Sequence, residues 1–416
     1  MCCFYGFWAG AWERNGFSIS GKVMLEAAFN SREGVMDRYG LAYMMPTDMN
    51  LNQVKMDLNK VSDIRLTARA ANLGIAYSKM LGNGIVMTAK ADADVLWSSG
   101  NNTHILLKQA TVSSVIPFGT NGSEVELSLG HGIHPLAEDA PDIFAYGGGA
   151  PFNPLGYAPH FSIKGRFGKI FSVKAAALAQ SEYPGNGPEG VSTNYIKYSM
   201  IPEAFLDLRI ENRGWTAALG ADYLLTKPRL KGTYPFTDVT IFVNDRLDAL
   251  CGYSFLRYCA TYGNNILDIK GKSIYNRGMT HLNMYGGYAI RDVSDDMAMR
   301  YYCSVNSISA WLNASFGGDF KGHVFGGYLQ NLGSDYELYS TSPVYFTLDI
   351  SNVNYLWRAG GALSWNWKNL VIALEYAMTR VYYGDAAEID PADCLCKKGL
   401  RTLDNHGVCL VTSWKF

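Results

Sequence analysis

The sequence predicts an all-β fold, a transmembrane antiparallel β-barrel of about 16 strands, with 18 as the alternative count. Three observations predict it. Long segments alternate apolar and polar side chains, short polar turns alternate with long loops, and only 18% of the residues are charged, below the roughly 25% of typical soluble domains. No apolar run approaches the roughly 18 to 20 residues of a transmembrane helix, so a membrane would be crossed by strands.

The alternation is longest near the start of the chain. Between Phe17 and Phe29 the odd-numbered positions are apolar or small, and most even-numbered positions are polar. This stretch exceeds an average strand of roughly 5 to 6 residues and suits a tilted spanning strand of about 9 to 11. The same period of two recurs in segments 64–70, 85–97, 161–167 and 171–177. Their charges share one face, as expected for a face that lines an aqueous lumen.

The connections between segments are of two kinds. Short polar turns are predicted at 168–169, 212–214, 244–246 and 368–369, and longer loops at 30–60, 133–159, 181–202 and 383–405. Outer-membrane barrels have this asymmetry, and the aromatic residues near many segment ends, such as Trp215 and Trp367, suit girdles at the two membrane interfaces. A soluble propeller or paired sandwiches would also alternate, but the sequence shows no repeat of about 40 to 50 residues.

The two ends of the chain carry separate predictions. Residues 1–16 are expected to form an N-terminal segment and residues 17–416 the barrel. The first segment contains Ala9-Gly10-Ala11 without a basic n-region, so it is either a truncated signal sequence or an ordinary first strand. At the other end, Trp414 and Phe416 are predicted on the outward row of a strand that pairs with the first strand and closes the barrel.

A family resemblance covers the first half of the chain, from about Phe17 to Gly214. It is carried by FSISGKVMLEAAFNSREG, by VSDIRLTARA, by His134-Pro135 and Gly149-Ala150-Pro151-Phe152-Asn153-Pro154 in the long loop, and by VKAAALAQSEYPGNGPEG. In these stretches the chain resembles the DcaP-like porins, particularly those of Bacteroidetes. The resemblance implies a homotrimer of sixteen-stranded barrels in the outer membrane of a Gram-negative bacterium, in contact with lipid and lipopolysaccharide.

The loop 133–159 is the first candidate functional element. It holds three acidic residues, Glu138, Asp139 and Asp142, and then the backbone-shaping residues Gly147, Gly148, Gly149, Pro151 and Pro154. In porins the loop after the fifth strand folds into the lumen and narrows it, and glycines let its backbone lie against the wall. We therefore expect a constriction loop here, with an ordinary surface loop as the alternative. A phosphate-binding loop is excluded because no Lys-Ser/Thr pair follows the glycines.

Inward positions on the early segments form the second candidate element, because they are rich in basic residues: Arg65, Arg69, Lys108, Lys164, Arg166 and Lys174. Opposite an acidic loop, such a wall would create a field across the lumen that favours anions. Alternatively, these side chains are polar only because they face water, or they tether the loop.

The remaining features exclude several functions. A net charge of −1 gives no basic stripe for nucleic acid. His131 and His134 are expected on opposite faces of a strand end, so no metal site is predicted, and no cofactor or catalytic trio is indicated. The eight cysteines match no disulfide framework and receive no role. We predict a passive porin for small hydrophilic, preferably anionic solutes; the alternatives are a barrel enzyme and a soluble β-rich binding protein.

Overall fold

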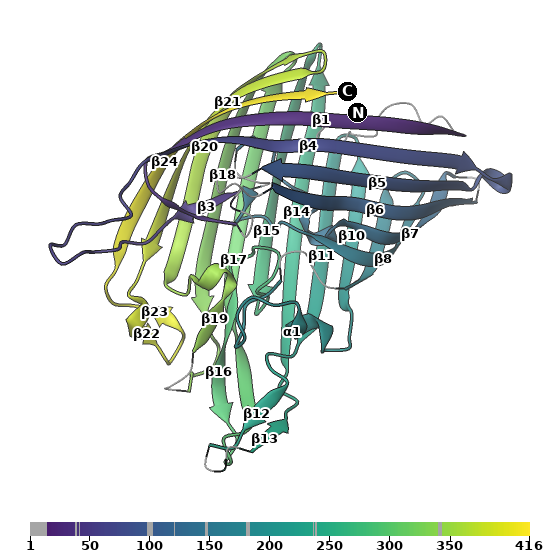
Figure 1. Cartoon of the computed structure of the whole chain (residues 1–416). Coiled ribbons are helices and arrows are strands. Elements are labelled where there is room, and N and C mark those ends of the chain that lie inside the picture. Colours follow the sequence, from purple (N-terminus) through teal and green to yellow (C-terminus); the bar gives the residue numbers. More distant parts are fainter. Residues whose placement is uncertain are drawn as a thin grey trace.

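The computed structural model describes residues 15–37, 40, 42–97, 103–119, 121–145, 149–179, 184–235, 237, 239–339 and 343–416. Sixteen antiparallel strands form a closed barrel in these residues (Figure 1), which confirms the predicted fold class. In chain order they are β1 (Asn15–Asn30), β4 (Asp63–Met80), β5 (Val86–Trp97), β6 (Thr103–Phe118), β7 (Ser123–Ile133), β8 (Tyr157–Phe167), β9 (Phe171–Leu178), β10 (Glu203–Asn212), β11 (Trp215–Thr226), β14 (Leu247–Tyr262), β15 (Asn265–Arg277), β17 (Arg300–Gly317), β18 (Phe320–Gly333), β20 (Val353–Trp367), β21 (Leu370–Tyr383) and β24 (Arg401–Lys415).

The first and last strands close the ring. Strand β24 pairs antiparallel with β1, and Val23 lies opposite Trp414. Gly21 and Phe416 exchange two backbone hydrogen bonds of 2.9 and 3.0 Å, and the Phe416 ring lies where a Cβ on Gly21 would be. Closure leaves no unpaired strand edge in contact with hydrocarbon.

The outer face of the barrel is apolar, with exposed aromatic side chains toward both ends of the strands. Phe17, Ile19, Val23 and Leu25 of β1 point outward, as the period of two predicts. Beside the short turns the exposed aromatic residues include Phe17, Phe118, Phe167, Trp215, Tyr262, Phe320, Trp367 and Trp414. Such a row is typical of an aromatic girdle at a membrane interface.

Strand β4 is longer than the predicted segment because a bulge interrupts its alternation. Leu25 of β1 pairs with Ala68 and Met24 with Ala70, so Arg69 is the extra residue. Ile64 and Leu66 are exposed before the bulge, and Leu73 and Ile75 after it. The outward row therefore changes from even to odd numbers, which hides the second half of the strand from a simple alternation search.

The short turns and the long connections lie at opposite ends of the barrel. One end has tight turns, such as Gly168–Ile170 and Arg213–Gly214, and the other has the long segments 31–62, 134–156, 179–202, 227–246, 278–299, 334–352 and 384–400. The predicted turn at 244–246 is wrong in its placement: it ends the long connection 227–246, where Arg229 forms an ion pair with buried Asp245.

Short elements occupy the long connections, apart from η2 (Gly82–Gly84), which lies at the barrel end that has the short turns. They are β2 (Gly34–Met36), β3 (Tyr43–Pro46), η3 (Pro135–Ala137), α1 (Asn194–Lys197), β12 (Lys231–Thr233), β13 (Thr240–Phe242), β16 (Gly287–Val293), β19 (Val344–Phe346), η5 (Thr347–Asp349), η6 (Ala386–Glu388), β22 (Ile389–Asp390) and β23 (Leu395–Cys396). In the described residues, no helix has the length and apolar character needed to span a bilayer.

Much of the buried apolar surface lies inside the barrel, between loop residues and the inner wall. Met44 of β3, together with Leu136 and Phe152 of the segment 134–156, is fully buried. These side chains belong to one cluster with Leu356 of β20 and Val381 of β21. Loop segments thus pack into the end of the barrel that carries the long connections.

Candidate functional site

The segment 134–156, which follows the fifth barrel strand, makes contacts with opposite walls. Lys174 of β9 forms an ion pair with Glu138, and Glu375 of β21 accepts a hydrogen bond from the backbone N–H of Phe144 at 2.6 Å. Strand β21 is the eighth strand along the ring from β9, counting β10, β11, β14, β15, β17, β18, β20 and β21. In a ring of sixteen these strands are on opposite sides, so Glu138 and Phe144 contact opposite walls of the barrel.

All three acidic residues of this segment are ion-paired with the inner wall. Glu138 pairs with Lys174 of β9. Asp139 accepts two hydrogen bonds from the guanidinium of Arg209 on β10, at 2.6 and 3.2 Å. Asp142 is 2.8 Å from the Nζ of Lys270 on β15. The wall therefore neutralises each loop carboxylate and holds the loop in place.

The ion pair with Arg209 reverses the effect of burial on the pKa of Asp139. Burial would raise the pKa of the Asp139 carboxyl, but the hydrogen bonds and the charge of the Arg209 guanidinium lower it below its usual value. Asp139 is therefore ionised at neutral pH although its side chain is only 15% exposed.

Arg358 of β20 is a second anchor for the loops. The residue is only 1% exposed. It donates to the carbonyl oxygens of Ala150 and Met44 at 3.1 and 2.7 Å, and its Nε donates to Thr379 Oγ1 at 2.9 Å. One buried cation thus joins the segments 43–46 and 149–154 to β20 and β21.

Close packing fixes the second half of the loop. Gly149 has φ +88°, and a Cβ there would lie 2.5 Å from Pro141 Cγ. Pro151 and Pro154 are both buried. Trp311 of β17 donates through Nε1 to the Asn153 side chain at 3.1 Å. Gly147 and Gly148 lie outside the described residues.

The predicted basic residues are not gathered into one wall. Lys174 contacts the acidic loop, whereas three others pair with acids of the same or the next strand: Arg65 with Asp63 at 2.9 Å, Lys108 with Asp94 at 2.9 Å, and Arg166 with Glu124 at 3.3 Å. Lys164 has no ion pair within the described residues, and the Arg69 side chain lies outside them. A field across the lumen stays a prediction.

Sequence reasoning missed Arg209, Lys270 and Arg358, which hold the loop through ion pairs and hydrogen bonds. Arg209 and Lys270 occupy inward positions of alternating segments. This position in the alternation is the one feature of the sequence that could have indicated them. Arg358 follows Trp357 in an aromatic-rich segment without any acidic neighbour, so no local pattern indicates it.

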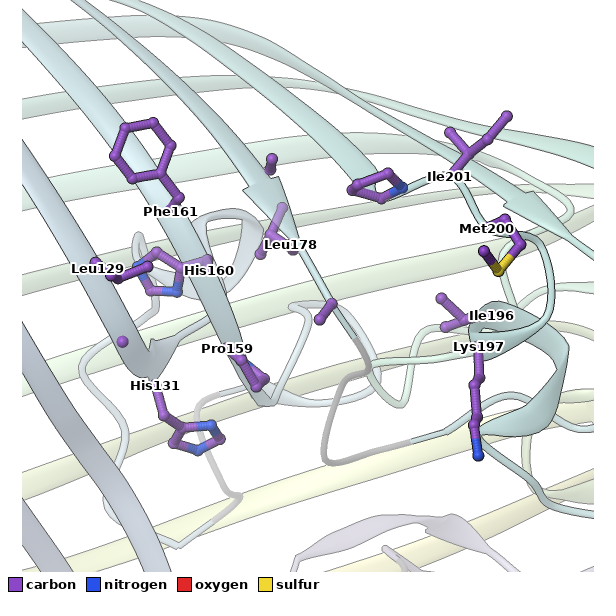
Figure 2. A pocket seen from close by; sticks show the side chains of 14 residues that line it. Leu129, His131, Pro159, His160, Phe161, Leu178, Ile196, Lys197, Met200 and Ile201 are labelled. Carbon is purple, nitrogen blue, oxygen red and sulfur yellow. The ribbon is translucent and has the colours of Figure 1, made fainter.

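A pocket of about 700 Å³ opens on the outer side of the barrel wall, away from the loop contacts. Figure 2 shows Leu129 of β7 and Phe161 of β8 on one side, and Ile196 of α1 with Met200 and Ile201 on the other. Its lining is mostly apolar, and the exposed Phe161 and Met200 place it on the surface that faces away from the lumen.

Solved structures with the same fold are outer-membrane proteins. The outer membrane channel DcaP of Acinetobacter baumannii has a TM-score of 0.65 at 11% identity, covering 98% of this chain and 99% of that one. An anion-selective porin from Comamonas acidovorans has 0.55 at 12%, covering 97% and 100%. The trimer form of OmpT from Vibrio cholerae has 0.51 at 10%, covering 97% and 100%.

No family model matches the sequence, and no curated protein matches it either. The structural likeness therefore defines the fold: the chain has the closed, sixteen-stranded barrel fold of outer-membrane porins.

Proposed function

We propose that this chain is a DcaP-like porin of the Bacteroidetes type, a passive channel for small hydrophilic solutes in the outer membrane of a Gram-negative bacterium. The observation that carries the proposal is the closed barrel with apolar side chains outside and ion-paired side chains inside. A soluble binding protein would have to bury the outward rows of β1, β4 and β24. The catalytic alternative is not adopted, because the similar structures that state a function are a channel and a porin.

The segment 134–156 serves in this proposal as the constriction. Three ion pairs on one side and Arg358 on the other hold it across the lumen. Because both halves are anchored, the segment stays in place and reduces the free cross-section of the barrel. Solutes pass beside it.

A preference for anions is the finer part of the proposal. Each loop carboxylate is neutralised by a base, so it repels anions weakly. Lys164 and Lys272 have no carboxylate within ion-pair distance among the described residues, and Lys272 instead donates to the carbonyl oxygen of Leu136. The fold of an anion-selective porin is compatible with this preference.

A homotrimer and contacts with lipid and lipopolysaccharide complete the proposal. The trimer form of a protein with the same fold supports it, and the apolar outer rows give the surface that either a neighbouring subunit or lipid would cover.

Liposome swelling tests the proposed function. Liposomes with the purified chain should swell in small uncharged sugars, and more slowly as the sugar becomes larger. Before use, the chain should change its gel mobility on boiling, as closed barrels do. Chemical cross-linking in detergent should give a trimer. Correctly folded chain that admits no sugar of any size would contradict the channel.

A further inference from the structure

Four polar side chains meet in a fully buried cluster beside the start of the inner loop. They are His134 after β7, Glu203 on β10, Asp222 on β11 and His281 after β15, and each is at most 1% exposed. Glu203 Oε1 is 2.7 Å from His281 Nε2 and 3.3 Å from His134 Nε2. Asp222 Oδ2 is 3.7 Å from His134 Nε2. Nothing in the proposed constriction requires this cluster.

The cluster carries two carboxylates that have no lysine or arginine partner among the described residues. Within the described residues, only the two histidines lie within ion-pair distance of Glu203 and Asp222. Glu203 Oε2 and both carboxylate oxygens of Asp222 are buried without a hydrogen-bond partner. Two uncompensated carboxylates are costly in a water-free site, so either a cation or protons must neutralise them.

The two histidines differ in what they can offer. The backbone N–H of Leu136 donates to His134 Nδ1 at 3.2 Å, so a neutral His134 carries its own proton on Nε2 and acts there as a donor. His281 Nδ1 has no hydrogen-bond partner. Its Nε2 lies 2.7 Å from Glu203 Oε1 and donates to that carboxylate when it carries the proton. A cation bound at Nε2 would take the place of this proton, which would then reside on Nδ1.

We propose that Glu203, Asp222 and His281 bind one divalent metal ion of the zinc class. Histidine nitrogen and carboxylate oxygen are the ligands that zinc takes besides thiolate. Ligand atoms of one zinc ion lie about 3 Å apart. Glu203 Oε1 is 2.7 Å from His281 Nε2, and the carboxylates of Glu203 and Asp222 both lie within 3.7 Å of one atom, His134 Nε2, so the three ligands border the same buried space. A divalent ion would neutralise both carboxylates at once.

His134 is a positioning residue in this site. It directs its Nε2 proton toward Glu203 and Asp222, as residues around a metal centre commonly do for the ligands. Because His134 also begins the segment 134–156, the ion would join the base of that segment to β10, to β11 and to the connection after β15.

Metal binding can be measured without any channel assay, so its outcome is independent of the proposed function. The full chain is purified in detergent, stripped with EDTA and dialysed against zinc, and the bound zinc is counted by atomic absorption. We expect one zinc ion per chain. Glu203→Gln, Asp222→Asn and His281→Gln should each abolish binding, and His134→Gln should weaken it by about 10- to 100-fold.

His323→Gln is the matched control, since His323 is buried in the wall but bonds to Ser364 Oγ at 3.0 Å and not to a carboxylate. It should bind zinc normally. Cobalt(II) bound in place of zinc should show the absorption spectrum of nitrogen and oxygen ligands. Cys251 of β14 lies opposite Asp222, and Cys251→Ser should leave this spectrum unchanged. Gel mobility before and after boiling shows which variants fold.

Two results would overturn the proposal. The first is wild-type chain that folds and binds no zinc. The second is undiminished zinc binding in Asp222→Asn and His281→Gln, which would place any bound ion elsewhere. The melting temperature of the metal-free proteins then identifies what holds the cluster together. If the metal-free Asp222→Asn variant melts at the same or a higher temperature than the metal-free wild type, the two carboxylates share a proton and not an ion.

Discussion

The ion pair between Arg209 and Asp139 allows the sharpest test of the inner loop. Arg209→Gln leaves the Asp139 carboxylate without its arginine partner, and Asp139→Asn leaves the Arg209 guanidinium with only its longer contact to Asp207, 3.4 Å from Nε to Oδ2. An unpaired unit charge interacts with an ion about 4 Å away by about 1 kcal/mol in bulk water and about 4 kcal/mol at the lower dielectric near a protein surface. The side chains of Arg209 and Asp139 are about one-sixth exposed, 17% and 15%. The interaction energy with a passing ion is therefore expected to lie between these two values.

Reversal potentials in asymmetric salt measure this effect. Arg209→Gln should shift the potential toward cations, Asp139→Asn should shift it toward anions, and the double variant should lie near the wild type, because the pair is neutral when intact or absent. The shifts should shrink in concentrated salt as the Debye length falls to about 3 Å at 1 M. Arg380→Gln removes a matched pair with Asp404 that faces outward between β21 and β24, and it should leave the potential unchanged.

The contrary result is that both single variants conduct with the wild-type reversal potential. That result would mean that permeating ions do not pass near this pair.

Three further predictions concern how the loop is held. Arg358→Met keeps the apolar volume but leaves the carbonyl oxygens of Met44 and Ala150 without their donor; unfolding in urea should show a loss of about 2 to 4 kcal/mol, and an unchanged curve would contradict the anchor. Gly149→Ala combines a positive φ with a clash against Pro141 and should cost about 1 to 3 kcal/mol, visible as extra noise in the open channel; a quiet channel would contradict the strain. Because Arg209 lowers the pKa of Asp139, the pair stabilises the loop above an unfolded pKa of about 4 and is lost as the pH falls through the lower folded value. Current noise should therefore rise only below about pH 4 in the wild type, whereas Arg209→Gln should show that noise at every pH.

The barrel was predictable because a strand's pattern is local. In β1 and β9 the alternation alone assigns each side chain to the outer or the inner face, since successive residues point to opposite sides. Closure was predictable from the outward row of β24, whose Val408, Leu410 and Trp414 are exposed in the structure.

The contacts inside the barrel were not predictable in the same way. Arg209 and Asp139 are 70 positions apart, and Arg358 and Ala150 are 208 apart, so no local spacing joins them. The bulge at Arg69 changes the face of β4 in mid-strand, and the cluster of His134 with Glu203, Asp222 and His281 brings together four separate elements. These pairs follow from where the strands lie around the ring, which the alternation does not specify.

Planar-bilayer conductance of the wild-type chain in asymmetric potassium chloride reports the pore and its selectivity in one recording. An anion-preferring porin should give a steady ohmic current, a reversal potential on the anion side, and loss of that preference as the salt becomes concentrated. If the chain folds, as its change of gel mobility on boiling verifies, and inserts but carries no current, it is not a channel.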